Sequence, residues 1–298
     1  MRTMMRVLAS VILTAVTVIM VPSGAQAEAS PELRMCLDNA TPQAQRVAAC
    51  SSVITNAPPA EAKELARIYF IRGNAYLTLG VYDRALADLD AATKANPTAH
   101  GPFNSRGVVF LRQKQLDRAI AELDQAIRLN PNDPISFTNR GDAWRDKGRF
   151  DRALGDYDAA IMLNPKSVNA SFGRALTLQQ KASSDFDAFV DEGRFEELAI
   201  AEYGKVLQIA PRHAGALSNR GQLYHTLRKY DLAIADFTQA IEINPANPLF
   251  LRNRALTYRM IRRFDLAIAD YRNALALTQD ADGRKLIGEW LTQLGAAV

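Results

Sequence analysis

The chain has 298 residues, of which 48% are hydrophobic and 23% are charged, a mixture typical of a folded protein and unlike that of a disordered one. Its formal net charge of +4 is spread thinly over this length, so the composition gives no reason to expect a nucleic-acid partner. A chain of this size can bury a large hydrophobic core.

The N-terminal segment, from Met1 to Ala27, has the pattern of a secretory signal peptide. Arg2 and Arg6 provide a basic start, residues 7–21 are apolar and uncharged, and residues 25–27 form a small-x-small cleavage site. About 15 apolar residues fall short of the roughly 20 that span a bilayer. We therefore expect cleavage after Ala27, a periplasmic or secreted location and no stable membrane insertion afterwards. An uncleaved anchor is the alternative. Cleavage removes two arginines and no acid, which lowers the net charge from +4 to +2.

The chain contains two cysteines, Cys36 and Cys50. Because export delivers a protein to an oxidising compartment, we expect them to form a disulfide. In the chain-entropy model, closing a loop of about 15 residues stabilises the fold by about 3 kcal/mol. Two buried free thiols are the alternative. Two cysteines are too few for a structural zinc site, which uses four ligands.

A repeat with a period of about 34 residues organises the rest of the chain. An Arg-Gly or Arg-Ala pair marks each period, and a proline closes every period except the last, where Gln279 stands in its place. Both markers advance by the same step except once, in the fourth unit, where the step is longer by 12 residues and indicates an insertion. The pairs begin at Arg72, Arg106, Arg140, Arg174, Arg220 and Arg254, and the prolines are Pro97, Pro131, Pro165, Pro211 and Pro245. These two markers define six units within residues 66–281.

Each unit has the pattern of two helices. In the first unit, Tyr69, Gly73 and Tyr76 share one face of a helix, and Ala85 and Leu89 mark the face of a second helix. Small residues let the two backbones approach, and large residues fill the space beside them. This arrangement resembles the tetratricopeptide repeat family, in the form found in exported bacterial proteins. The resemblance implies an all-α fold, a right-handed α-solenoid of stacked helix-turn-helix repeats with a concave groove.

Both ends of such an array need a cap, because a terminal unit lacks one neighbour. Within residues 28–65, the positions of Val47, Cys50, Val53, Ile54 and Pro58 match the second half of a repeat, and a short helix around residues 31–37 is expected to replace the first half. We therefore expect residues 28–65 to form an N-terminal capping half-repeat held by the disulfide. Residues 282–298 are expected to contain a C-terminal capping helix. Its apolar stripe consists of Leu286, Ile287, Trp290, Leu291 and Leu294.

The insertion lies within about 180–198, in the fourth unit. It is rich in acidic residues and carries Phe186 and Phe189 at helical spacing. One interpretation is that two helices are each lengthened by about two turns. The other is that an acidic, aromatic projection contacts a partner.

Every unit also has an acid at a fixed distance after its arginine, and only the insertion lengthens this distance. The six combinations are Arg72/Asp88, Arg106/Glu122, Arg140/Asp156, Arg174/Glu202, Arg220/Asp236 and Arg254/Asp270. A catalytic pair occurs once, whereas six copies indicate a structural role. We interpret them as ion pairs between the two helices of a unit or between adjacent units.

Motifs that carry chemistry are missing from the sequence. It has no Gly-rich phosphate loop, no G-x-S-x-G elbow and no H-E-x-x-H motif. His213 and His225 lie near opposite ends of one predicted helix, roughly 18 Å apart and too distant to share a metal ion. We therefore expect no catalytic residues, no cofactor and no metal site, and a protein that is not an enzyme.

The resemblance also implies where a partner binds, on the stripe of each unit's first helix that faces away from the second helix. The groove residues carried over from the family are Arg67, Phe70, Asn74, Asn104, Arg112, Asp142, Arg145, Gln222, Arg252 and Arg259. Including Asp146, which shares the stripe, basic residues outnumber acidic ones five to two. This excess indicates a polypeptide partner of acidic character, and an ordinary solvated face is the alternative. The carboxylate clamp of some family members is not expected, because Phe70 occupies the position of its lysine.

We therefore expect an exported, non-enzymatic protein–protein interaction scaffold that binds a partner protein or peptide through its groove. The exported proteins that it resembles suggest the periplasm of a Gram-negative bacterium. A self-associating structural envelope protein, and so a homo-oligomer, is the alternative, because exposed repeat faces can also pair with themselves. An enzyme or a metal carrier is less favoured.

Overall fold

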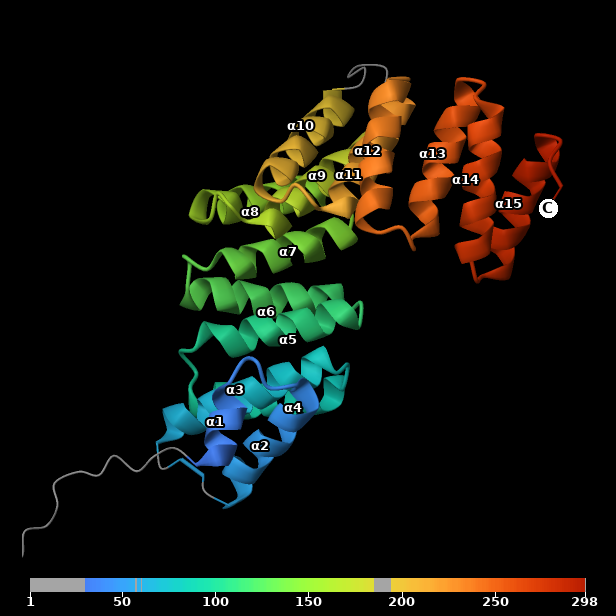
Figure 1. The fold of residues 1–298 in the computed structure, drawn as a ribbon. Helices are drawn as coiled ribbons and strands as arrows, with labels where there is room; N and C mark the ends of the chain where they lie inside the picture. The colour runs from blue at the N-terminus through green and yellow to red at the C-terminus, as the bar shows by residue number, and fades with distance from the viewer. Residues whose placement is uncertain (1–29, 57, 60, 185–193, 298) are drawn as a thin grey trace, which may run out of the picture.

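The computed structural model describes residues 30–56, 58–59, 61–184 and 194–297, and no residue in these ranges belongs to a strand (Figure 1). The expected signal peptide and the middle of the insertion, residues 185–193, lie outside the described residues. The helices are α1 (Pro31–Leu37), α2 (Gln43–Asn56), α3 (Ala62–Thr78), α4 (Tyr82–Ala95), α5 (His100–Arg112), α6 (Leu116–Leu129), α7 (Pro134–Asp146), α8 (Phe150–Leu163), α9 (Val168–Ser184), α10 (Arg194–Ile209), α11 (Ala214–Thr226), α12 (Tyr230–Ile243), α13 (Pro248–Met260), α14 (Phe264–Leu277) and α15 (Ala281–Gln293).

The helices form pairs that stack in chain order. The tightest packing is within α3–α4, α5–α6, α7–α8, α9–α10, α11–α12 and α13–α14, and each pair then packs on the next. Figure 1 shows the stack running from α1 and α2 in blue to α15 in red, with a bend around α9 to α12. The expected all-α solenoid is therefore confirmed.

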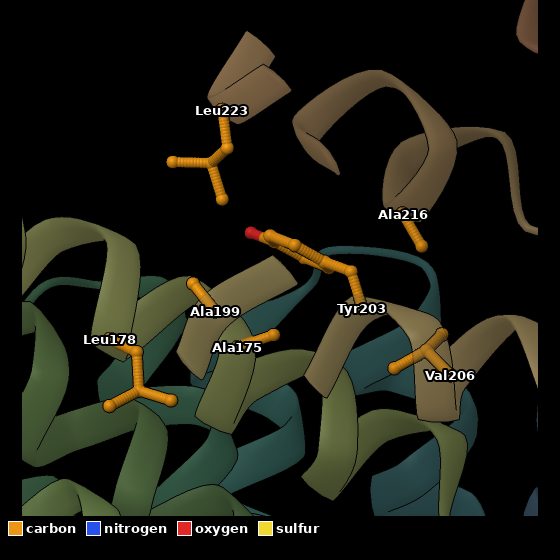
Figure 2. Packing of buried hydrophobic residues seen from close by; sticks show 7 residues of the cluster. All are labelled: Ala175, Leu178, Ala199, Tyr203, Val206, Ala216 and Leu223. Atoms are coloured by element: carbon orange, nitrogen blue, oxygen red, sulfur yellow. The ribbon is translucent and has the colours of Figure 1, made fainter. Parts of the chain in front are cut away.

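Close helix packing depends on small residues opposite buried aromatic rings. The ring of Tyr157 is fully buried, and a Cβ added to Gly173 would lie 2.6 Å from it, so α8 can approach α9 only because position 173 has no side chain. In the fourth unit, Tyr203 is buried with Ala175 of α9 and Ala216 of α11 (Figure 2). The alternation of small and large residues in the sequence therefore determines how closely the helices of the array pack.

All six arginine–acid pairs form, with nitrogen–oxygen distances between 2.5 and 2.9 Å. Each pair joins the first helix of a unit to its second helix. Some arginines also reach the preceding unit, as Arg140 does with Asp124 of α6 at 2.8 Å. Ion pairs within a unit and between adjacent units therefore both occur, because the guanidinium of Arg140 links α7 to α8 and to α6.

The turn after a first helix uses a left-handed residue. Glycine occupies this position in two units, at Gly80 and Gly148, with φ values of 74° and 71°. Lys114, Arg228 and Arg262 adopt the same backbone conformation with φ values of 58°, 59° and 60°. Residues with a Cβ are strained there, so these turns are held by the packing of the helices on either side.

Each end of the described array is closed by an additional helix or helix pair. Cys36 of α1 and Cys50 of α2 form the expected disulfide, and both are fully buried. At the other end, Ile287 and Leu291 of α15 are buried against α14, whereas Leu286, expected in the same stripe, is 40% exposed. Next to the insertion, α9 has 17 residues and α10 has 16, compared with 13 in α5 and 14 in α6.

Candidate functional site

The first helices of the units line the inside of the curved stack. Helix α3 packs on α5, α5 on α7, α7 on α9, and α11 on α13, whereas no two second helices in the described part of the chain pack as closely. Elements on the inside of a bend lie nearer to one another, so the exposed sides of these first helices form the concave surface. We call it the inner face.

Seven of the ten predicted groove residues line one of four cavities that follow one another along the array. They are Arg67 and Phe70 between α3 and α5, Arg112, Asp142 and Arg145 between α5 and α7, Gln222 between α11 and α13, and Arg252 between α13 and α15. The structure therefore brings Arg112, Asp142 and Arg145 together and leaves the others in separate units.

The remaining three residues line none of these four cavities. Asn104 has a structural role, because its side-chain oxygen accepts hydrogen bonds from Ser136 at 3.3 Å and from Asn139 at 2.9 Å. These bonds tie α5 to α7. Asn74 lies on α3 and Arg259 lies on α13, where burial raises the pKa of nearby Tyr271 and the charge of Arg259 opposes this rise.

The cavity between α5 and α7 is dense in charge. It has a volume of about 310 Å³ and combines three basic groups with two acidic ones. Its lining residues are Val108, Leu111, Arg112, Lys114, Asn139, Asp142, Arg145 and Asp146. Lys114 pairs with Asp146 across the cavity at 2.8 Å. The remaining charges are those of Arg145, Asp142 and Arg112.

Arg145 is held by its neighbours. Its guanidinium contacts Asp142 at 2.7 Å and the hydroxyl of Tyr157 at 3.0 Å, and that hydroxyl donates to Asp142 at 2.7 Å. Burial on its own lowers the pKa of Arg145, but the contact with Tyr157 and the negative charges of Asp142 and Asp146 outweigh this effect, so the pKa lies above its ordinary value. Burial also raises the pKa of Tyr157, which stays protonated.

A similar balance applies to Asp146. Burial on its own raises its pKa, but the hydrogen bond from Lys114 and the charge of Arg145 outweigh this effect, so the pKa is lowered. Asp146 is therefore ionised at neutral pH. The fixed charges of Lys114, Arg145, Asp142 and Asp146 compensate one another, and Arg112 is the cation left over.

Part of the positive charge expected for the groove is neutralised within the chain. Arg67 pairs with Glu64 at 3.5 Å, and Arg145 pairs with Asp142. This leaves three groove arginines with no ion-pair partner in the described part of the chain, namely Arg112, Arg252 and Arg259. An acidic partner would meet three separate cations on the inner face.

The described residues contain neither a cluster of metal ligands nor a membrane-spanning helix. No group of three or more His, Cys, Asp or Glu side chains lies close enough together to hold a metal ion. No described helix combines the length and the apolar character needed to cross a membrane.

Sequence reasoning missed several residues of these cavities. Lys114 and Asn139 line the cavity between α5 and α7, and Asn253 lines the one between α11 and α13. The asparagines had a detectable signal, because Asn139, Asn219 and Asn253 occupy the same position in their units. The buried tyrosine hydroxyls that reach towards the inner face had no such signal, because they belong to second helices.

Family models described as tetratricopeptide repeat match residues 71–134, 138–184 and 214–247. Among the curated proteins, no match is found. The fold also resembles solved structures at low sequence identity, which supports the fold alone.

One is a structure of PilF from Pseudomonas aeruginosa, at 16% identity and a TM-score of 0.65, covering 78% of this chain and 99% of that one. A second, from the APC/C hetero-tetramer Cut9–Hcn1, is 17% identical with a TM-score of 0.65 and covers 83% of this chain and 48% of that one. A tetratricopeptide repeat protein from Parabacteroides merdae is 15% identical with a TM-score of 0.58, covering 85% and 92%.

Proposed function

The chain belongs to the tetratricopeptide repeat family, and we propose that it is an exported scaffold that holds a partner polypeptide on its inner face. The observation that carries this proposal is the cavity between α5 and α7. There, four charged side chains compensate one another, and Arg112 stands beside them without an ion-pair partner in the described residues. A carboxylate of a bound polypeptide is the group that would complete this arrangement.

Export is supported by two features that are independent of the groove. The segment from Met1 to Ala27 has a basic start, an apolar run and a small-x-small site. Cys36 and Cys50 are joined by a disulfide that is fully buried in the first helix pair, and such bonds form and persist in oxidising compartments. We infer a periplasmic or secreted scaffold from these two features.

The test is affinity capture from an envelope extract. The chain, expressed from its full-length sequence, is compared with the variant Arg112→Glu. Arg128→Glu is the matched control, because it makes the same charge change in the last turn of α6, on an exposed site of a second helix. Both changes place an acid at a helix C-terminus, so their effects on helix stability are similar.

The proposal predicts one partner that the wild type and Arg128→Glu retain and that Arg112→Glu loses while its circular dichroism stays unchanged. Equal capture by all three proteins would move recognition away from the cavity between α5 and α7. Capture of nothing but further copies of the same chain would favour self-association instead.

A further inference from the structure

A tyrosine hydroxyl from a second helix joins two first helices in the middle of the array. The Tyr203 hydroxyl of α10 donates to the Gln179 side chain of α9 at 2.7 Å and accepts from the Asn219 amide of α11 at 3.1 Å. Figure 2 shows this oxygen at the end of the ring that faces Leu223. One oxygen therefore satisfies a donor and an acceptor from two units.

The next unit keeps equivalents of both partners and lacks the hydroxyl. His225 occupies the position of Gln179, and Asn253 occupies the position of Asn219. The residue in the position of Tyr203 is Phe237, which is buried in the same way and carries no oxygen. The two polar side chains therefore face a ring that cannot bridge them.

A cavity and an unpaired donor lie at this place. The cavity, of about 250 Å³, is lined by Gln222, His225, Thr226, Phe237, Asn253 and Leu256. Asn253 is only 9% exposed, and its amide nitrogen has no hydrogen-bond acceptor among the described residues. A buried donor without an acceptor is uncommon in folded proteins and is unfavourable, so an incoming acceptor oxygen would be stabilised here.

The lining of this cavity is uncharged. His225 Nδ1 lies 2.9 Å from the hydroxyl oxygen of Thr257, and that hydroxyl donates to the backbone carbonyl oxygen of Asn253 at 2.9 Å. The imidazole therefore donates from Nδ1, which leaves Nε2 as an acceptor. Burial lowers the pKa of His225, so the ring stays neutral at neutral pH. Of the less exposed polar side chains in the lining, His225 thus offers an acceptor and Asn253 a buried donor, whereas the polar groups of Gln222 and Thr226 are exposed.

We propose that this cavity binds the hydroxyl group of a Ser, Thr or Tyr side chain presented by the polypeptide on the inner face. The hydroxyl would donate to His225 and accept from Asn253, as the Tyr203 hydroxyl does with Gln179 and Asn219. A carbonyl oxygen could satisfy Asn253 alone, an ammonium group could satisfy His225 alone, and a carboxylate would find no cation in the lining. This inference rests on the proposed function, because it identifies one contact of the bound polypeptide.

The test uses the full chain with ¹⁵N in its asparagine side-chain amides. The probes are the blocked tripeptides acetyl-Ala-Thr-Ala-amide and acetyl-Ala-Val-Ala-amide, which have similar shapes and differ by the hydroxyl. The Thr peptide should shift the Asn253 amide signal in a saturable way, with an affinity about tenfold higher than that of the Val peptide. Equal responses to the two peptides, or no response at Asn253, would overturn the proposal.

Two variants sharpen the test. Phe237→Tyr supplies the missing hydroxyl from the chain itself, so it should weaken the Thr peptide about tenfold and raise the melting temperature. Tyr203→Phe produces the same pair of unpaired groups one unit earlier, so the Thr peptide should then shift the Asn219 amide as well. Undiminished binding of the Thr peptide by a folded Phe237→Tyr variant would contradict the assignment of the site.

Two further comparisons are needed. One distinguishes the hydroxyl group of a peptide from that of a small alcohol, and the other distinguishes failure of the hydroxyl site from failure of the proposed scaffold. Glycerol presents hydroxyl groups without a peptide, and a response at Asn253 as strong as that to the Thr peptide would assign the cavity to small alcohols. Arg112 and Phe237 line different cavities, so capture of the partner through Arg112 and binding of the Thr peptide beside Phe237 can be tested separately. If Arg112→Glu loses the partner while Asn253 ignores the Thr peptide, the hydroxyl site fails and the scaffold stands. The reverse pattern would move recognition away from the cavity between α5 and α7 and keep the hydroxyl site.

Discussion

Replacing Arg140 by methionine should measure how strongly the arginine–acid pairs hold neighbouring helices together. Arg140 makes two hydrogen bonds to Asp156, at 2.8 and 2.6 Å, and one to Asp124 at 2.8 Å. Methionine keeps most of the aliphatic stem and removes the guanidinium group. The change therefore leaves the Asp156 carboxylate without its charged partner.

The expected loss in the free energy of unfolding follows from how exposed the side chains of Arg140, Asp156 and Asp124 are. Removing one partner of a fully buried ion pair costs about 3–5 kcal/mol. The side chains of Asp156 and Arg140 are 9% and 21% exposed, so screening reduces this to about 2–3 kcal/mol. Asp124 is 37% exposed, and its pair should contribute less than about 1 kcal/mol.

The assay is urea unfolding followed by circular dichroism at pH 7. The wild type is compared with Arg140→Met, with Asp156→Asn and with the double variant. The double variant should recover at least half of the loss, because it leaves no uncompensated buried charge. Arg128→Met, on an exposed site of α6, should change the stability by less than about 0.5 kcal/mol. A loss below about 0.5 kcal/mol for Arg140→Met would refute the structural role of these pairs.

The remaining predictions concern single features of the array. Tyr271→Phe should leave the stability unchanged or raise it by up to about 1 kcal/mol in urea unfolding, because the Tyr271 hydroxyl is buried with no partner among the described residues. Burial lowers the folded-state pKa of His225, so its contribution to stability is present above the unfolded pKa near 6.5 and is lost as the pH falls through the folded pKa. His225→Gln should therefore lose less stability than the wild type between pH 7.5 and 5. Arg228→Gly should stabilise the chain by roughly 0.5–1 kcal/mol, and a lower melting temperature would contradict the strain assigned to that turn. Reduction of the Cys36–Cys50 bond should destabilise the first helix pair by about 3 kcal/mol, seen as faster hydrogen exchange in α1 and α2.

The sequence was sufficient to predict the helix pairs, because each structural constraint recurs once per unit. The six Arg-Gly or Arg-Ala pairs, the five closing prolines and the six spaced acids mark the same period, and such agreement does not arise by chance. The short link between two helices of a unit also makes their pairing local. A repeat array is for this reason more readable from sequence than a fold built from distant contacts.

The details of the inner face could not be predicted in the same way. Arg145 looked like a free groove cation, but its charge is satisfied by Asp142 and the hydroxyl of Tyr157. His225, Phe237 and Asn253 belong to three helices from two units. The hydroxyl missing between them is recognised only by comparison with the bonds that Tyr203 makes. Departures from the repeat therefore define the candidate contacts of the inner face, and their meaning depends on geometry.

The most direct test of the scaffold is hydrogen–deuterium exchange of the full chain with and without its captured partner. We expect slower exchange in α5 and α7, which line the cavity that contains Arg112, and little change in α6 and α8 behind them. Protection confined to the second helices, or to the segment around residues 180–198, would contradict binding on the inner face.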